Sequence, residues 1–168
     1  MKNLYLFVGP SGSGKSTAIC KLHEMYGWPM IESYTNRPMR CPNEVGHIFV
    51  SKEEFEALPQ KLALVYYHGY GYCVIPEQIT DGGLYAIEPS GVEFFRNSPY
   101  SSKIKVVGFP LNEDLYVKRM RDRGDTEESI EARVNGEREL FKHVAGISDI
   151  YLGGVVSDLA KYITKEEA

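Results

Sequence analysis

Short apolar runs alternate with segments of helical periodicity along most of the chain. Residues 4–8 form a fully apolar run, which is typical of a strand buried on both faces of a parallel sheet. From Lys15 to Tyr26 apolar residues recur at the spacing of a helix. Residues 84–87 and 104–109 are further apolar runs that predict buried strands. This alternation predicts an α/β fold with a mainly parallel sheet flanked by helices.

Capping residues and chain breakers mark the remaining predicted elements. Ser51 and Glu54 form a capping box before an apolar run. Thr126 is likewise a polar residue that can cap the start of a helix. The sequence therefore predicts a short helix from Ser51 and a helix that starts at Asn112 or Asp114 and runs to Arg123. It also predicts a helix from Thr126 to about His143, a strand at residues 150–152 and a closing helix from Ser157.

The segment between residues 33 and 80 interrupts this alternation. Residues 33–48 are rich in Arg, Pro, Asn and Gly and predict a loop or irregular strand, whereas residues 62–75 are rich in Tyr and Gly and predict strands joined by a tight turn. We interpret the segment as a lobe inserted into one domain that covers residues 1–168, because the length suits one compact core.

Composition narrows the class of protein. The formal net charge of −4 argues against a general nucleic-acid binder, which usually carries a basic surplus. The cysteines, Cys20, Cys41 and Cys73, are widely separated and form no C-x-x-C pair, so zinc binding and disulfide chemistry are disfavoured. The early apolar run is too short to span a membrane. We expect a cytoplasmic protein without a membrane partner.

A glycine-rich loop follows the first predicted strand and precedes the first predicted helix. Its sequence matches G-x-x-x-x-G-K-[ST], so its backbone N–H groups can surround the phosphates of ATP. Lys15 would supply a charge to the β- and γ-phosphates, and Ser16 would ligate Mg²⁺. A flexible glycine turn is the alternative, which the flanking strand and helix disfavour. The predicted ATP-binding residues are Gly9, Pro10, Ser11, Gly12, Ser13, Gly14, Lys15, Ser16 and Thr17.

A second basic element lies on a proline-stiffened loop. Arg37 and Arg40 are three residues apart and could converge on one anion, since arginine forks bind phosphate oxygens bidentately. A solvated basic loop explains the same two residues as well, so this segment alone leaves both interpretations open.

Several motifs along the chain together resemble one family. They are Gly9-Pro-Ser-Gly-x-Gly-Lys-Ser-Thr17, Ser33-Tyr-Thr-x-Arg-Pro-x-Arg40, Asn43-Glu-Val-Gly46, Phe49-Val-Ser-Lys-Glu-Glu-Phe55, Gly69-Tyr-Gly-Tyr72 and Arg119-Met-Arg-Asp-Arg-Gly124. In this order they resemble the guanylate kinase family. The resemblance implies a P-loop kinase fold, an acceptor-binding lobe at about residues 33–80 and a short helical lid at about residues 115–138. It also implies Mg²⁺-dependent transfer of phosphate from ATP to a nucleoside monophosphate, with GMP or dGMP favoured.

The resemblance assigns roles to particular residues. The acceptor-binding residues that it implies are Ser33, Arg37, Arg40, Tyr72 and Glu88. The catalytic residues that it implies are Lys15 and the lid arginines Arg119, Arg123 and Arg133. Such a cluster suits phosphoryl transfer, which needs neutralised oxygens and little covalent chemistry. For the lid arginines an exposed helix with Glu–Arg pairs is the alternative.

The departures from the family bear on the acceptor base. Where the family has a glutamate and a serine that read guanine, this sequence has Ala63 and Val74. A family tyrosine that contacts the acceptor phosphate corresponds to His47, and the first carboxylate of the family's Asp-x-Asp is lost, which leaves Glu88. Apolar side chains cannot select a base by hydrogen bonding.

Three explanations of these departures remain open. The register could be shifted so that Tyr66, Tyr67 or His68 takes the base-reading role. The acceptor could be another or a modified nucleotide, or a ribosyl phosphate. The chain could also be a non-catalytic binding module, although Lys15 and the lid arginines argue against that. The tyrosines between residues 66 and 72 could stack on a base or could be ordinary strand residues.

Overall fold

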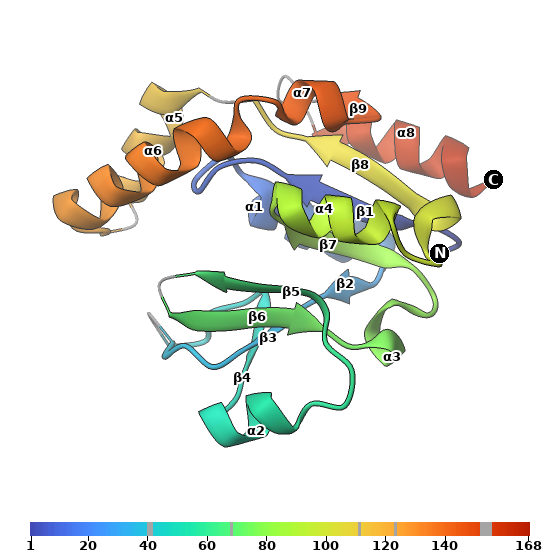
Figure 1. Cartoon of the computed structure of the whole chain (residues 1–168). Coiled ribbons are helices and arrows are strands. Elements are labelled where there is room, and N and C mark those ends of the chain that lie inside the picture. The colour runs from blue at the N-terminus through green and yellow to red at the C-terminus, as the bar shows by residue number, and fades with distance from the viewer. Residues whose placement is uncertain (40–41, 68, 111, 123, 152–155) are drawn as a thin grey trace.

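The computed structural model of the chain describes residues 1–39, 42–67, 69–110, 112–122, 124–151 and 156–168 (Figure 1). Its central element is a five-stranded sheet with the strand order β2-β7-β1-β8-β9, and all neighbouring strands in it are parallel. The strands are β1 (Leu4–Val8), β2 (Met30–Ile31), β7 (Gly83–Ile87), β8 (Ile104–Gly108) and β9 (Ile150–Tyr151). The predicted mainly parallel sheet is confirmed.

Strand β1 lies at the centre of this sheet and is buried on both faces. Leu6 and Val8 join one apolar core with residues of α4 (Pro89–Arg96) and α7 (Val144–Ile147). Tyr5 and Phe7 join the opposite core with residues of α1 (Lys15–Tyr26) and α8 (Val156–Glu167). Because successive strand residues point to opposite faces, a fully apolar run is what this central position requires.

A second sheet is built from the inserted segment. It has four strands in the order β4-β3-β6-β5, where β4 is parallel to β3 and the other pairs are antiparallel. The strands are β3 (Ser33–Thr35), β4 (His47–Phe49), β5 (Leu62–Tyr67) and β6 (Tyr70–Val74), with α2 (Lys52–Ala57) and α3 (Pro76–Ile79) connected to them. Figure 1 shows this sheet beside the parallel sheet, with α2 at its outer end.

Two helices project together from the parallel sheet. They are α5 (Glu113–Asp122) and α6 (Glu127–Phe141), which lie side by side in Figure 1. A small apolar cluster of Tyr116 and Met120 from α5 and Ile130 and Val134 from α6 holds them to each other. The pair therefore carries its own core at the edge of the molecule.

Three helices, α2, α5 and α6, start at predicted capping residues. Ser51 and Glu54 form the expected capping box, and Thr126 Oγ1 accepts a hydrogen bond from Ser129 N at 3.3 Å. Of the two candidates for the start of α5, Asn112 supplies the cap, since its Oδ1 accepts from Leu115 N at 3.2 Å. Other elements were not predicted, namely β2, α3, α4, α7 and the 3-10 turn η1 (Ser101–Lys103).

The predicted boundaries need small corrections. The helix expected to reach His143 ends at Phe141. Leu152 of the last predicted strand and Arg123 of the predicted lid helix lie outside the described residues. Within the part of the chain that the structure describes, every helix is too short or too polar to cross a bilayer.

Candidate functional site

The glycine-rich loop runs from the end of β1 to the start of α1. Gly12 and Gly14 have φ values of +74° and +101°, a left-handed conformation that disfavours other residues. A Cβ atom on Gly12 would also lie 2.8 Å from the carbonyl oxygen of Tyr116, so this glycine allows the loop to approach α5. The loop thus has the tight turn that a phosphate-binding backbone needs.

Lys15 is the first residue of α1 and folds back over the loop. Its Nζ donates to the carbonyl oxygens of Gly9 at 2.7 Å and Pro10 at 2.8 Å. Ser16 and Thr17 follow on the exposed first turn of the helix. The ammonium group is therefore held beside the backbone N–H groups of the loop, where it adds to the positive end of the helix.

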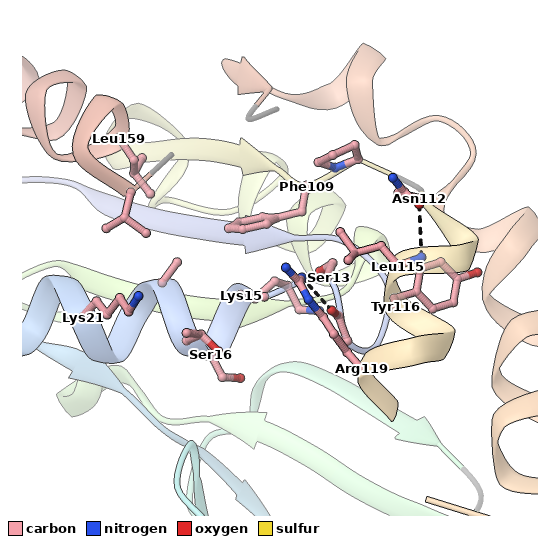
Figure 2. Close-up of a pocket in the computed structure, with 16 residues that line it drawn as sticks. Ser13, Lys15, Ser16, Lys21, Phe109, Asn112, Leu115, Tyr116, Arg119 and Leu159 are labelled. Carbon is pink, nitrogen blue, oxygen red and sulfur yellow. Dashed lines mark hydrogen bonds between the residues drawn. The ribbon is translucent and has the colours of Figure 1, made fainter. Parts of the chain in front are cut away.

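A cleft of about 610 Å³ opens over the loop and the first two turns of α1. Figure 2 shows Lys15 and Arg119 around the loop, Ser16 and Lys21 along α1, and Phe109 on the opposite wall. The cleft therefore combines a cationic end with an apolar wall, an arrangement that suits a polyphosphate joined to an apolar group such as a base.

Arg119 reaches the loop from α5. Its Nη1 donates to the carbonyl oxygen of Gly12 at 3.1 Å, and this bond is drawn in Figure 2. The side chain also lines the larger cleft. Of the predicted lid arginines Arg119 and Arg123, Arg119 lies at the loop and Arg123 lies outside the described residues.

Helix α6 contacts the loop through an acid and an arginine. Glu137 accepts hydrogen bonds from Ser11 N at 2.7 Å and from Ser11 Oγ at 2.5 Å. Arg133, one helical turn earlier, donates from Nη1 to Ser11 Oγ at 3.5 Å and lies 3.9 Å from a carboxylate oxygen of Asp125. The donors of Ser11, which was predicted to bind ATP, thus point toward α6.

A second cleft of about 350 Å³ lies between the four-stranded sheet and α6. Its lining residues are Arg37, Pro38, Tyr67, Tyr70, Tyr72, Ser129, Ala132 and Arg133. Two arginines therefore face this cleft from opposite elements, together with three tyrosines. Arg133 also contacts Ser11 of the glycine-rich loop, so this side chain links the smaller cleft to the loop whose following residues line the larger cleft.

Arg37 is almost fully buried, with 6% of its surface exposed. Its Nη1 and Nη2 donate to the two carboxylate oxygens of Glu44 at 3.0 and 2.5 Å, and its guanidinium carbon lies 5.0 Å from the centre of the Phe49 ring. Burial lowers the pKa of this guanidinium, but the hydrogen bonds and charge of Glu44 outweigh burial and raise the pKa above its ordinary value. Arg37 therefore stays charged.

The Nε atom of Arg37 is buried and has no hydrogen-bond partner among the residues that the structure describes. An unsatisfied buried N–H of a charged group is costly, by about 1–3 kcal/mol. Because the same side chain lines the smaller cleft, an anion bound there could satisfy it. This geometry favours an anion-binding arginine over a solvated basic loop.

Other predicted acceptor residues have different positions. Tyr72 lines the smaller cleft, and its ring centre lies 5.5 Å from that of His47. Ser33 and Glu88 line neither of the two clefts: the Ser33 hydroxyl is buried 3.0 Å from Tyr85 Oη, and Glu88 accepts a hydrogen bond from the Ser90 hydroxyl. Arg40 lies outside the described residues.

The two positions at which the guanylate kinase pattern has its guanine-reading residues belong here to the apolar core. Ala63 is 6% exposed and Val74 is fully buried, and both pack in the cluster that contains Leu6 and Val92. Ala63 has φ +48° and lies where the register between β5 and β6 shifts, so the backbone is irregular there. These two side chains offer no hydrogen-bonding group to a ligand.

The chemistry of the larger cleft fits Mg²⁺ bound together with a triphosphate. Among the described residues, no group of three or more His, Cys, Asp or Glu side chains is arranged to hold a metal ion. Mg²⁺ bound with nucleotides usually takes one or two protein ligands, phosphate oxygens and water. The exposed hydroxyl of Ser16, which lines this cleft, could be such a ligand.

Glu44 and Glu137 were not predicted to take part in the site. Glu44 follows Arg37 by 7 residues, and Glu137 meets Ser11 across 126 residues of sequence. The one available signal for Glu137 was its position four residues after Arg133, which puts both on one face of a helix.

Comparisons with known proteins agree with this geometry. No protein-family model matches the chain. Guanylate kinase from Legionella pneumophila (strain Paris) is 31% identical over 141 residues, which cover 76% of this chain and 66% of that protein. This chain thus spans just under two thirds of the length of that relative. Guanylate kinase from Prochlorococcus marinus (strain NATL2A) is 30% identical over 153 residues, which cover 83% of this chain and 82% of that protein.

A solved structure gives the same result for the fold. The crystal structure of guanylate kinase from Anaplasma phagocytophilum superimposes with a TM-score of 0.70 at 18% identity, covering 98% of this chain and 84% of that chain. At this identity the likeness concerns the fold alone, and it confirms the predicted P-loop kinase fold.

Proposed function

Since the chain belongs to the guanylate kinase family, we propose that it transfers the terminal phosphoryl group of ATP to a nucleoside monophosphate. The observation that carries this proposal is Arg133, which contacts Ser11 of the glycine-rich loop and also lines the smaller cleft opposite Arg37. A phosphoryl group passing from one cleft to the other would cross this side chain. Transfer between two bound phosphates needs such a shared cation.

The larger cleft is the proposed ATP site. The backbone N–H groups of residues 12–17 and the Lys15 ammonium would bind the phosphates, and Arg119 would add a second cation from α5. Pro10 has no N–H to offer, and the N–H of Ser11 is bonded to Glu137. Lys15 would exchange its bonds to Gly9 O and Pro10 O for phosphate oxygens. Mg²⁺, held in part by Ser16, would supply further neutralisation of charge when bound.

The smaller cleft is the proposed acceptor site. Arg37 would bind the acceptor phosphate through its unpartnered Nε, while Glu44 holds the other edge of the guanidinium. Tyr72 lies beside this position, and Arg40 and Arg123 remain proposed members of the site from the resemblance alone. No general base is required, because the acceptor phosphate is already anionic and needs only to be held in line.

We further propose the finer assignments that follow from this reaction. Residues 33–80 serve as the acceptor-binding lobe and residues 115–138 as the lid, with Glu88 near the end of β1 to orient water or the acceptor. The partners are small nucleotides, with GMP and dGMP favoured by the resemblance. A cytoplasmic location fits these metabolites and the free thiols of Cys20 and Cys73.

A different acceptor is the second candidate. The specific observation in its favour is the apolar burial of Ala63 and Val74, which leaves those two positions unable to read guanine. A non-catalytic binding module would instead bind nucleotide without turnover, so an assay for turnover separates such a module from a kinase.

The test is ADP release from ATP and Mg²⁺ with GMP, dGMP, AMP, CMP, UMP, dTMP and ribose 5-phosphate as acceptors. We expect at least one acceptor to stimulate ADP release well above hydrolysis in water. Lys15→Ala should reduce kcat to less than about a tenth, because its ammonium contacts only phosphate in the reaction. Lys52→Ala, a lysine on α2 that is largely exposed, is the matched control and should leave kcat unchanged. Lack of stimulation by every acceptor would overturn the kinase proposal.

A further inference from the structure

Glu137 is a buried carboxylate on the face of α6 that meets the glycine-rich loop. Only 6% of its surface is exposed. A carboxylate is buried at high cost unless hydrogen-bond donors compensate it. Here Oε2 accepts from the backbone N–H of Ser11 at 2.7 Å, and Oε1 accepts from the Ser11 hydroxyl at 2.5 Å. Both of these donors to Glu137 thus belong to one residue of the loop.

The Ser11 hydroxyl links Glu137 to Arg133. Because this hydroxyl donates its proton to Glu137, its oxygen is free to accept, and Arg133 Nη1 lies 3.5 Å away. Arg133 and Glu137 are four residues apart on α6, so they stand one above the other on the helix. The arginine, the serine and the carboxylate form a chain from the smaller cleft to the glycine-rich loop.

The half of the loop around Ser11 also holds the other cations of the site. Gly9 O and Pro10 O accept from Lys15 Nζ, and Gly12 O accepts from Arg119 Nη1. A displacement of Ser11 would therefore disturb the positions of Lys15 and Arg119 as well as that of Arg133. One carboxylate on α6 is connected to three cations through the loop backbone.

We propose that Glu137 is a positioning residue that anchors the glycine-rich loop to α6 and so fixes Arg133 relative to the ATP site. The inference rests on the proposed function for its effect on turnover. Glu137 touches neither substrate in this account; it acts through Ser11. Misplacing a group that acts on the transferring phosphate by about 1 Å can cost on the order of 100-fold in rate, even where ground-state binding changes little.

The kinetic test uses two variants of the same residue. Glu137→Ala should lower kcat by about 10-fold to 100-fold while the KM of the acceptor stays within about threefold of the wild type. Glu137→Gln can still accept from Ser11 N through its amide oxygen, and its NH2 can donate to Ser11 Oγ in place of the reverse bond, so it should stay within about fivefold of wild-type kcat. Glu131→Ala, an exposed glutamate on the same helix, is the matched control and should leave kcat unchanged.

A double-variant cycle tests whether Glu137 works through Arg133. If Glu137 positions Arg133, adding Glu137→Ala to Arg133→Ala should cost much less than the 10-fold to 100-fold that Glu137→Ala costs alone. Fully multiplicative losses would overturn the inference, as would a Glu137→Ala variant with wild-type kcat and a lowered melting temperature only. The second result would mean that Glu137 serves stability alone.

Hydrogen–deuterium exchange tests the anchor without turnover. The peptide that covers residues 9–14 should exchange faster in Glu137→Ala than in the wild type, and Glu137→Gln and Glu131→Ala should match the wild type. Equal exchange in all four proteins would overturn the anchor. If the wild type shows no turnover but the exchange pattern is as expected, the proposed function fails and the anchor stands, so the two failures are distinguishable.

Discussion

At the scale of single residues, Lys15, Arg37, Arg119 and Arg133 each donate a hydrogen bond to an oxygen atom of the protein. Lys15 bonds to loop carbonyls, Arg119 bonds to Gly12 O, and Arg37 bonds to the carboxylate of Glu44. These contacts fix the side chains before a phosphate arrives, so less rotamer entropy is lost when the phosphate binds. Arg37 is the most constrained of them, because it is buried and bonded to both carboxylate oxygens of Glu44.

The position of Arg37 predicts an effect on the acceptor and not on ATP. Arg37→Ala should raise the KM of the acceptor or lower kcat by the equivalent of about 2–4 kcal/mol, because a desolvated arginine–phosphate contact is lost. The affinity for ATP should be nearly unchanged, since Arg37 lines only the smaller cleft. Steady-state kinetics with each substrate varied in turn measures both effects.

Two further variants control this experiment. Arg96→Ala removes an exposed arginine that lines neither cleft, and it should leave both KM values unchanged. Arg37→Lys keeps the charge and loses the bidentate fork, so it should fall between the wild type and Arg37→Ala. An equal loss of ATP affinity in Arg37→Ala would mean that this loop serves the other substrate.

At the scale of elements, the parts of the structure that depend on local sequence were predicted well. The parts that depend on long-range contacts were not. The strand, loop and helix from Leu4 to Tyr26 are contiguous, so periodicity and the loop motif predict them together. Helix α4 was not predicted, because Pro89 and Gly91 interrupt its pattern and its burial depends on contact with β5, which lies far earlier in the chain. Tertiary packing here outweighs local propensity.

The same distinction applies to the site. The ATP loop is one motif, whereas the contact of Glu137 with Ser11 joins residues separated by 126 positions. Nothing in a single sequence specifies which face of α6 meets the loop. The pairing of Arg37 with Glu44 is closer in sequence, but it depends on the irregular path between β3 and β4.

Helix α6 carries Arg133 and Glu137, and the contribution of its N-terminal cap to the stability of the proposed lid can be tested. Thr126→Ala removes the acceptor for Ser129 N and should lower the free energy of unfolding by about 1 kcal/mol. Thr126→Ser keeps the hydroxyl oxygen and should be close to the wild type. Urea denaturation followed by circular dichroism measures the difference. Equal losses in both variants would show that the methyl group of Thr126, and not the cap, stabilises the helix.

At the scale of the whole molecule, a chain of net charge −4 gathers its functional cations at two adjoining clefts. The parallel sheet supplies the ATP loop, the four-stranded sheet supplies Arg37, and the α5–α6 pair lies over both through Arg119 and Arg133. The electrostatic attraction for phosphate is therefore local. In the proposed function this arrangement would hold the phosphates and would leave the recognition of the acceptor base to the remaining lining residues.

Those lining residues predict weak discrimination between bases. Ala63 and Val74 are part of the apolar core, and the lining that the structure describes for the smaller cleft contains tyrosines but no carboxylate. Each buried hydrogen bond that cannot form should remove about 1–3 kcal/mol of selectivity for guanine. We therefore expect kcat/KM for GMP to exceed that for AMP, CMP, UMP or dTMP by less than about 100-fold at fixed ATP. A preference of several thousandfold for GMP would contradict this, and it would mean that a residue other than Ala63 or Val74 reads the guanine edge.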